Sequence, residues 1–211
     1  NNNIAIKNGN LKLPKIGLVR IKLSRNFTGR ILNVTVSRKA TGKYFVSLCV
    51  EEEVEIFPNN GGEIGIDVGI KDFYSDSNGD VAANPKTLKK YSKKLAREQR
   101  KLSRKAKGSN NRNKQRIIVA RVHEKIANIR KDYLNKVSTK LVKENQLIGI
   151  EDLQVRNMLK NHQLAQAISD VSWSEFFRML EYKAVPHSCR VVRIPRFYPS
   201  SQTCCKCGYQ N

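Results

Sequence analysis

The sequence predicts an α/β protein in which a β-rich start is followed by a sheet with helices packed on it. Three observations favour this fold class. Short β-forming runs fill residues 1–57, two later apolar strands lead to the acids Asp67 and Glu151, and a long segment with helical periodicity separates those two strands. Strands that alternate with helical segments are typical of sheets that are covered by helices.

Residues 1–60 are predicted to form a small antiparallel β-domain, either a barrel or a sheet. β-Forming runs lie at residues 4–6, 11–13, 17–23, 31–36 and 44–50, and Asn8-Gly9 and Thr41-Gly42 supply turns between them. The acids of residues 51–53 and the turn residues of 58–62 then interrupt the pattern. We place a domain boundary at this break.

The next strand, Ile64 to Val68, carries the acid Asp67 in an otherwise apolar run. A turn at Lys71-Asp72 leads to a second strand, and Asn78-Gly79 leads to a third around Val81, so the three strands are expected to form an antiparallel meander. A carboxylate on a central strand is costly unless a metal or hydrogen-bond donors offset its charge. The alternative is an acid at a strand end that caps its neighbours.

A second apolar strand, residues 147–150, leads directly to Glu151, which is 84 positions after Asp67 (151 minus 67). Such a separation suits neighbouring strands of one sheet that are joined by a long excursion. Carboxylates that converge from strand ends suit magnesium, which binds through one or two carboxylates and substrate phosphate. Two such ions about 4 Å apart can activate the attacking water and stabilise the leaving oxygen.

The excursion between these strands is strongly basic. The whole chain has 40 lysine or arginine residues against 18 acids, and residues 84–146 hold 21 of the former and 4 of the latter. Helical spacing predicts a hairpin broken at Gly108, with apolar stripes at Leu88, Tyr91, Leu95 and Leu102 and at Ile118, Val122, Ile126, Ile129, Tyr133, Val137 and Leu141.

Repulsion on this scale favours a nucleic acid that neutralises the hairpin, since a merely solvated surface usually mixes signs. A solvated basic face and contact with an anionic membrane are the alternatives. The predicted nucleic-acid-binding residues are Lys89, Lys90, Lys93, Lys94, Arg97, Arg100, Lys101, Arg104, Arg112, Arg116 and Arg121.

Residues 173–184 are predicted to form a helix, with Asp170 and Ser172 as its starting residues. Its apolar face, Trp173, Phe176, Phe177 and Leu180, suits core packing. A last strand is expected at residues 189–194, before Pro195. No apolar run approaches the roughly 20 residues of a membrane-spanning helix, so we expect a cytoplasmic protein without a membrane partner.

The five cysteines favour a metal knuckle over a disulfide framework, because three of them crowd into residues 204–207. Cys204 and Cys207 form a CxxC followed by Gly208, which is the shape of a zinc knuckle. Zinc prefers four ligands, so this segment supplies a half-site. Cys49 and Cys189 lie in or beside strands and are predicted to be small buried hydrophobes.

Several motifs, in this order and spacing, resemble the C-terminal part of the TnpB family, the OrfB proteins of bacterial and archaeal insertion sequences, which are related to type V CRISPR effectors. The motifs are LPKIGLVRIK from Leu13, GIDVGIKDF from Gly65, IEDL from Ile150, SWSEF from Ser172, LEYKA from Leu180 and PSSQTCCKCG from Pro199. They extend over nearly the whole chain.

The resemblance implies a wedge-like β-domain over 1–60, a RuvC-like nuclease of RNase H fold over 61–197 with the basic hairpin 84–146 inserted, and the first half of a zinc ribbon over 198–211. Asp67 and Glu151 match the first two catalytic acids, and the third acid and second CxxC of the family follow the tail seen here. The implied activity is RNA-guided DNA cleavage with Mg²⁺ or Mn²⁺, and the implied partners are guide RNA and target DNA. The alternatives are a nucleic-acid-binding regulator or relic that does not cut, and a transposase that joins DNA.

Overall fold

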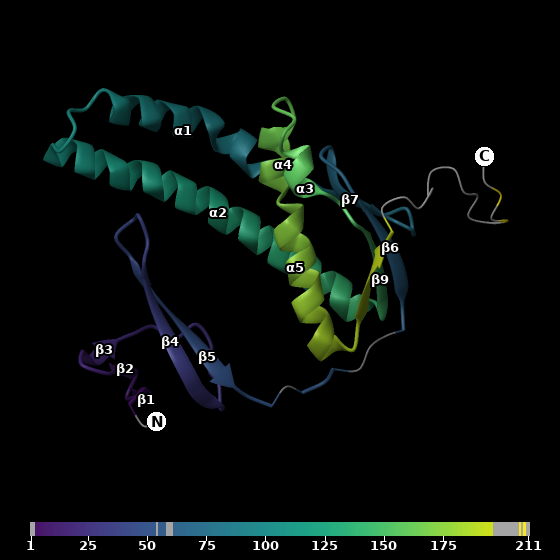
Figure 1. The fold of residues 1–211 in the computed structure, drawn as a ribbon, viewed down its shortest axis with the longest axis horizontal. Coiled ribbons are helices and arrows are strands. Elements are labelled where there is room, and N and C mark those ends of the chain that lie inside the picture. Colours follow the sequence, from purple (N-terminus) through teal and green to yellow (C-terminus); the bar gives the residue numbers. More distant parts are fainter. Residues whose placement is uncertain (1–2, 54, 58–60, 196–206, 208, 210–211) are drawn as a thin grey trace.

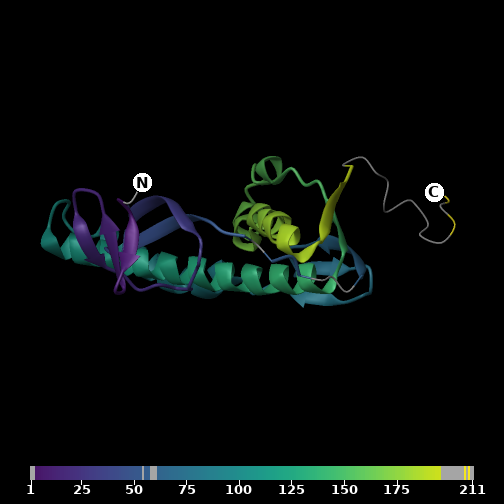
Figure 2. The same ribbon diagram turned by 90° about the horizontal axis from the view of Figure 1, so that it is seen from below.

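The computed structural model describes residues 3–53, 55–57, 61–195, 207 and 209. Its helices and strands form a β-domain, a long helical hairpin, and a sheet with shorter helices against it (Figure 1). Turned by 90°, the second helix of the hairpin runs from the sheet to the β-domain (Figure 2). No helix in the described ranges is long and apolar enough to cross a membrane.

The β-domain contains two separate antiparallel sheets. The first consists of β1 (Ala5–Lys7), β2 (Asn10–Leu13) and β3 (Gly17–Arg20), and the second of β4 (Arg30–Arg38) and β5 (Tyr44–Glu51). These strands lie where the sequence predicts them. Cys49 is exposed, however, so its predicted burial is wrong. Strand residues alternate between faces, and Cys49 lies on the face opposite Leu48 and Val50, which are half-buried.

The second part of the chain is built on a five-stranded sheet with the order β10-β9-β6-β7-β8. Strands β6 (Glu63–Val68), β7 (Asp72–Asp76) and β8 (Val81–Ala83) form the predicted antiparallel meander. Strand β9 (Leu147–Glu151) pairs in parallel with β6, and β10 (Arg190–Ile194) pairs in parallel with β9. The structure is therefore a mixed α/β fold, as predicted, with antiparallel and parallel strands in one sheet.

One face of this sheet forms the main hydrophobic core. Ile64, Ile66, Ile148 and Ile150 point into it and meet side chains from the helices α2 (Asn110–Glu144) and α5 (Trp173–Ala184). The predicted apolar face of α5 is buried here, and the ring of Phe176 packs edge-on against that of Phe73 at 4.9 Å. Cys189 packs against this core but is only half-buried, so its predicted burial is confirmed in part.

The basic segment folds into the predicted helical hairpin of α1 (Thr87–Ser103) and α2. Its own small apolar cluster of Leu95, Val119, Val122 and Ile126 is separate from the main core. The predicted stripe on α2 is partly wrong, because Ile118 and Ile129 are 41% and 37% exposed. Helix α2 meets α1 with its first half and the sheet and α5 with its second half, and the buried side of a long helix changes when its neighbours change.

The start of α1 is capped from a distant element. Asp170, in α4 (Ala165–Val171), accepts hydrogen bonds from the Leu88 backbone N–H at 2.8 and 3.0 Å. Arg130 of α2 donates to the Ser169 carbonyl oxygen at 3.1 Å and lies 3.9 Å from the Asp170 carboxylate. Asp170 therefore joins the base of the hairpin to the core. Its predicted role as a starting residue of α5 is wrong, and Ser172, at the start of α5, makes no capping bond with its side chain.

A lysine joins α5 to α2. Lys183 donates to the Asn135 carbonyl oxygen and to the hydroxyls of Ser138 and Thr139, at 2.8 to 2.9 Å, so all three ammonium protons have acceptors. Partial burial lowers the pKa of this ammonium. The remaining short elements, α3 (Val155–Met158) and the 3₁₀ turn η1 (Val185–His187), connect β9 to α4 and α5 to β10.

Glu98 is the acid of α1, and it holds the two helices of the hairpin together. It is 5% exposed, accepts a hydrogen bond from Gln115 Nε2 of α2 at 2.9 Å, and pairs with Arg97 and Lys101. The hydrogen bond from Gln115 is the main reason why the pKa of Glu98 lies below its usual value of 4.5. The ionised form is therefore favoured in the folded hairpin.

This shift predicts an acid-sensitive hairpin. A carboxyl whose pKa is lower in the folded than in the unfolded protein stabilises the fold above its unfolded pKa, and this stability is lost as the pH falls through the folded pKa. We expect the thermal unfolding temperature of the wild type to fall between about pH 5 and pH 3 by more than that of Glu98→Gln. Circular dichroism melting measures this, with Asp132→Asn, an exposed acid of α2, as the matched control. Equal pH dependence in wild type and Glu98→Gln would contradict the assignment.

Candidate metal centre and nucleic-acid interface

The structure brings Asp67 and Glu151 together at the ends of neighbouring strands. The parallel register of β6 and β9 pairs Gly65 with Gly149 and Ile66 with Ile150, so Asp67 and Glu151 each follow at the next position. The alternation of side chains explains their common side. Ile66 and Ile150 enter the core, and the next residue on each strand therefore points to the opposite face.

On this face small residues lie beside the two acids on β6, β7 and β9, while Ile194 of β10 is paired directly with Glu151. Gly65 and Gly149 lie side by side, each two positions before its acid, and Ser75 of β7 is paired directly with Asp67. A Cβ atom added at Gly65 or Gly149 would meet other atoms only at 3.8 Å or more. The glycines therefore leave space beside the carboxylates that side chains would otherwise fill. Asp67 is exposed and Glu151 is half-buried, so a ligand in solution can reach both.

The negative charges of Asp67 and Glu151 influence each other. Burial, and then the charge of Asp67, raise the pKa of Glu151 above its usual value of 4.5. Within the described ranges neither acid forms an ion pair or a side-chain hydrogen bond, in contrast to Asp152, which lies 3.6 Å from Arg193. Two close carboxylates without a cation repel each other, and a bound divalent ion relieves that repulsion.

The donor set fits a hard divalent cation. Carboxylate oxygens are the ligands that Mg²⁺ and Mn²⁺ prefer, and magnesium requires one or two of them when it also keeps water and substrate phosphate. Among the described residues no group of three or more His, Cys, Asp or Glu side chains is placed to hold a metal. Asp67 and Glu151 are the candidate metal ligands because of their carboxylate donors and their neighbouring positions on β6 and β9.

The predicted zinc half-site is only partly described. Cys207 is described and exposed, whereas Cys204 lies outside the described residues.

The predicted nucleic-acid-binding residues are spread over both helices of the hairpin and are exposed, except Arg112, which is half-buried. Arg112 Nη1 donates to the carbonyl oxygens of Leu102 and Lys105, at 2.8 and 2.9 Å, and so closes the turn between the helices. Arg97 and Lys101 are paired with Glu98. The ion pairs and polar contacts of the described side chains leave the charges of Lys89, Lys93 and Arg100 unpaired.

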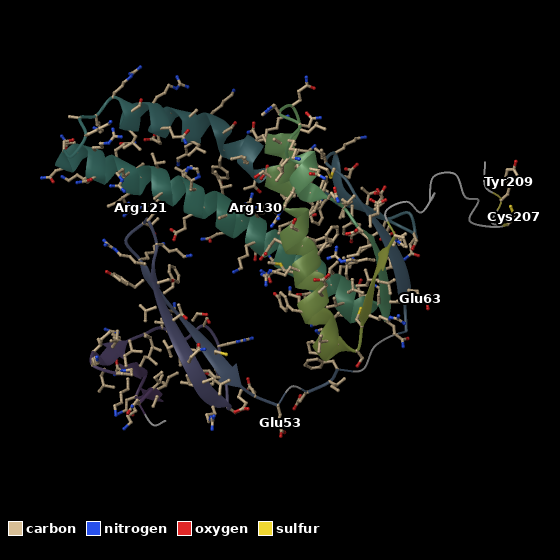
Figure 3. The ribbon with its side chains drawn as sticks, viewed as in Figure 1. Glu53, Glu63, Arg121, Arg130, Cys207 and Tyr209 are labelled. Carbon is tan, nitrogen blue, oxygen red and sulfur yellow. The ribbon has the colours of Figure 1, made fainter. Side chains whose placement is uncertain are left out.

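Two surface hollows lie on this hairpin. The first has a volume of about 670 Å³ and lies along α1, where Lys93, Lys94, Arg97 and Arg100 line it. The second, of about 270 Å³, lies between the two helices. Arg121 projects from the outer half of α2, and Arg130 marks the place where α2 passes α4 (Figure 3).

Sequence reasoning missed a contact between the β-domain and the hairpin. Glu124 of α2 accepts hydrogen bonds from Lys43 at 3.0 Å and from Thr41 at 3.3 Å. These two residues belong to the β4–β5 turn, which lies beside α2 in Figure 1. Glu124 stands among basic residues of α2, which could have indicated a contact with a cation outside the helix. Its partner Lys43 is 81 positions away in the chain, so the sequence did not identify it. The contact places Lys43 beside the basic surface of α2.

Comparison with known proteins gives a family match. Residues 47–162, more than half of the chain, match the OrfB family of IS605, which is described as "Probable transposase". Residues 173–211 match the Cas12f1-like TNB domain.

Curated relatives extend beyond the chain. A Streptomyces pristinaespiralis protein named "Putative RNA-guided DNA endonuclease" is 49% identical over 83% of this chain and 44% of its own length. Escherichia coli K12 InsQ, which has the same description, is 39% identical over 96% of this chain and 54% of its own length. The chain thus spans about half the length of these relatives. A Cas12f1–sgRNA–target DNA complex matches with 16% identity and a TM-score of 0.46, over 84% of this chain and 45% of that one.

Proposed function

We propose, from the premise that this chain belongs to the OrfB (TnpB) family of IS605 probable transposases, that it forms the metal-dependent nuclease part of an RNA-guided DNA endonuclease. The pairing of Asp67 and Glu151 on neighbouring parallel strands is the observation that carries this proposal. The names of the curated relatives support the same class of activity. Because the chain spans about half of those relatives, the activity is proposed for the full-length protein.

The sheet topology supports a RuvC-like RNase H fold for residues 61–197. Three antiparallel strands are followed by two parallel ones, and the order in the sheet is β8-β7-β6-β9-β10. In chain order β6 is the first strand of this sheet and β9 the fourth, and these two lie side by side. An RNase H-like site places its first two acids on these two strands. In the same proposal residues 1–60 form a wedge-like domain, and 198–211 begin a zinc ribbon that contains Cys204 and Cys207.

Asp67 and Glu151 would hold the Mg²⁺ or Mn²⁺ ions. Bound there, the ions lower the pKa of water and balance the charge of an in-line displacement at phosphorus. The residues of the chain orient and expose the carboxylates. Ile66 and Ile150 anchor the two strand ends in the core, while Gly65 and Gly149 keep the space beside the acids free for a phosphodiester. Glu151 must be deprotonated to bind a cation, so its raised pKa makes binding weaker in acid.

The basic hairpin is proposed to hold nucleic acid by its phosphates. Exposed cations on α1, such as Lys89, Lys93 and Arg100, can pair with phosphates and release the counterions that surround a nucleic acid. Such contacts favour binding without reading the base sequence. Guide RNA and target DNA are the proposed partners. In such a division of labour base pairing reads the sequence and the protein reads the backbone.

A second candidate is a transposase that joins DNA, which the printed family description favours. RNase H-like sites serve both hydrolysis and strand transfer, so the fold does not separate the two reactions.

The test uses the full-length protein, an RNA that carries a guide, and a plasmid with the matching target. We expect cleavage that requires both the RNA and Mg²⁺, and that stops when a chelator removes the ion. Sequencing of the DNA ends distinguishes free ends from joined products. Joined products without free ends would favour the transposase, and cutting that ignores the guide or proceeds in chelator would exclude the proposal.

A further inference from the structure

The hollow between the two helices of the hairpin differs from the rest of their basic surface. Its lining combines an aromatic ring and two aliphatic side chains, Tyr91, Ile118 and Val122, with the cations Lys94, Arg121 and Lys125. None of the described residues that line it is an acid. The hollow therefore offers an apolar floor inside a positively charged rim.

The packing of the hairpin accounts for only part of this floor. Ile118 is 41% exposed, although Val119 and Val122 beside it are buried between the helices. Tyr91 is half-buried against the small apolar cluster, and one face of its ring is occupied by the Lys125 ammonium, 5.3 Å from the ring centre. Lys125 is exposed, so another flat group can replace its ammonium on this face of the ring.

We propose that this hollow, which we call the Tyr91 hollow, binds one unpaired base of a single-stranded nucleic acid. The base stacks on Tyr91 and rests against Ile118, and the flanking phosphates pair with Lys94, Arg121 and Lys125. The proposal rests on the proposed function, in which the hairpin holds nucleic acid, and it adds the class of strand.

The chemistry of the lining selects this ligand. A duplex presents phosphates outward and keeps its bases stacked, so it uses the cations and leaves the apolar floor uncovered. Single strands combine a backbone in a positive groove with bases on aromatic side chains, and every base has a face that can stack. The volume of about 270 Å³ is below the lower end of drug-sized pockets, about 300 Å³, which fits one base better than a larger ligand.

Replacement of Lys125 on the ring is favourable. An exposed cation–π contact is weaker than the stacking of a base on an aromatic ring. The displaced ammonium can pair with the phosphate of the same nucleotide. The β4–β5 turn adds to the rim, because Glu124 lies between Arg121 and Lys125 on α2 and binds Lys43 at 3.0 Å. Lys43 thus neutralises Glu124, so this acid does not repel a phosphate at the rim.

The experiment measures binding of the chain to a fluorescein-labelled single-stranded oligothymidine and to a duplex of equal length, by anisotropy. Tyr91→Leu keeps the apolar packing and removes the ring, and Tyr91→Phe keeps the ring. We expect Tyr91→Leu to weaken binding of the single strand by about tenfold and to leave duplex binding unchanged, while Tyr91→Phe binds like the wild type. An oligonucleotide with abasic sites should bind wild type and Tyr91→Leu equally.

The matched control is Tyr182→Leu, since Tyr182 is an exposed tyrosine on α5 with Arg178 over its ring at 5.4 Å. It should bind both probes like the wild type, and circular dichroism should show equal helix content in all variants. Single-strand affinity that survives Tyr91→Leu, or an equal loss for the duplex, would overturn the Tyr91 hollow and leave the proposed function standing. Failure of the wild-type chain to bind either probe would overturn both.

Discussion

We expect Asp67→Asn and Glu151→Gln each to abolish DNA cleavage by the full-length protein and to leave its binding of guide RNA and target DNA unchanged. Each substitution replaces a carboxylate of the pair by a neutral amide, which is a poor ligand for magnesium. Stabilisation of charge by a metal is worth several kcal/mol, and about 4 kcal/mol corresponds to a thousandfold in rate. We therefore expect a loss of at least about a thousandfold, measured as the single-turnover cleavage rate of a labelled target.

Glu63→Gln is the matched control for this experiment. Glu63 is an exposed carboxylate on the same strand and the same face as Asp67, four positions earlier, and it is labelled in Figure 3. It should cleave at the wild-type rate. Cleavage by either Asp67→Asn or Glu151→Gln at that rate would remove the residue from the metal centre.

The Glu151→Gln variant is also expected to change the thermal stability of the protein. A carboxyl whose pKa is raised by folding has its full stability below the unfolded pKa and loses it as the pH rises through the folded pKa. Burial and the charge of Asp67 raise the pKa of Glu151, so its ionised form costs stability at neutral pH. Glu151→Gln should therefore melt at a higher temperature than the wild type at pH 7 without divalent ions, and Mg²⁺ should raise the melting temperature of the wild type only.

We expect neutralisation of three cations on α1 to weaken nucleic-acid binding by up to about a thousandfold at 0.1 M salt. The variant Lys89→Gln/Lys93→Gln/Arg100→Gln removes three charges from one side of the helix. Removal of one cation that pairs with a phosphate weakens binding by about tenfold at this salt concentration and reduces the slope of log K against log salt by about one. Titrations of labelled duplex between 50 and 200 mM salt measure both quantities.

A triple variant of equal charge tests whether position matters. Lys136→Gln/Lys140→Gln/Lys143→Gln lies at the other end of the hairpin, where Lys136 and Lys140 are paired with Asp132 and Glu144. It should lose much less affinity, because paired lysines release fewer counterions. Equal losses and equal slopes in the two variants would show that total charge, and not the α1 surface, governs binding.

Local sequence determined most of the secondary structure. The β-meander, the break of the hairpin at Gly108 and the helix at residues 173–184 follow from turn residues and from apolar spacing, which act over a few positions. The two acids also had a local signal, because each interrupts or ends an apolar strand where an unpaired charge is costly. Basic composition alone indicated a polyanionic partner for the hairpin.

Tertiary structure alone decided which residues meet. The parallel register that aligns Asp67 with Glu151, the capping of α1 by Asp170, and the Glu124 contact with the β4–β5 turn all join residues more than 80 positions apart. It also reversed the burial expected for Cys49 and Ile118, because a strand or helix has two sides and only the packing of its neighbours decides which side is covered. Periodicity describes one element at a time, whereas burial and pairing are properties of two elements, so they exist only once the chain has folded.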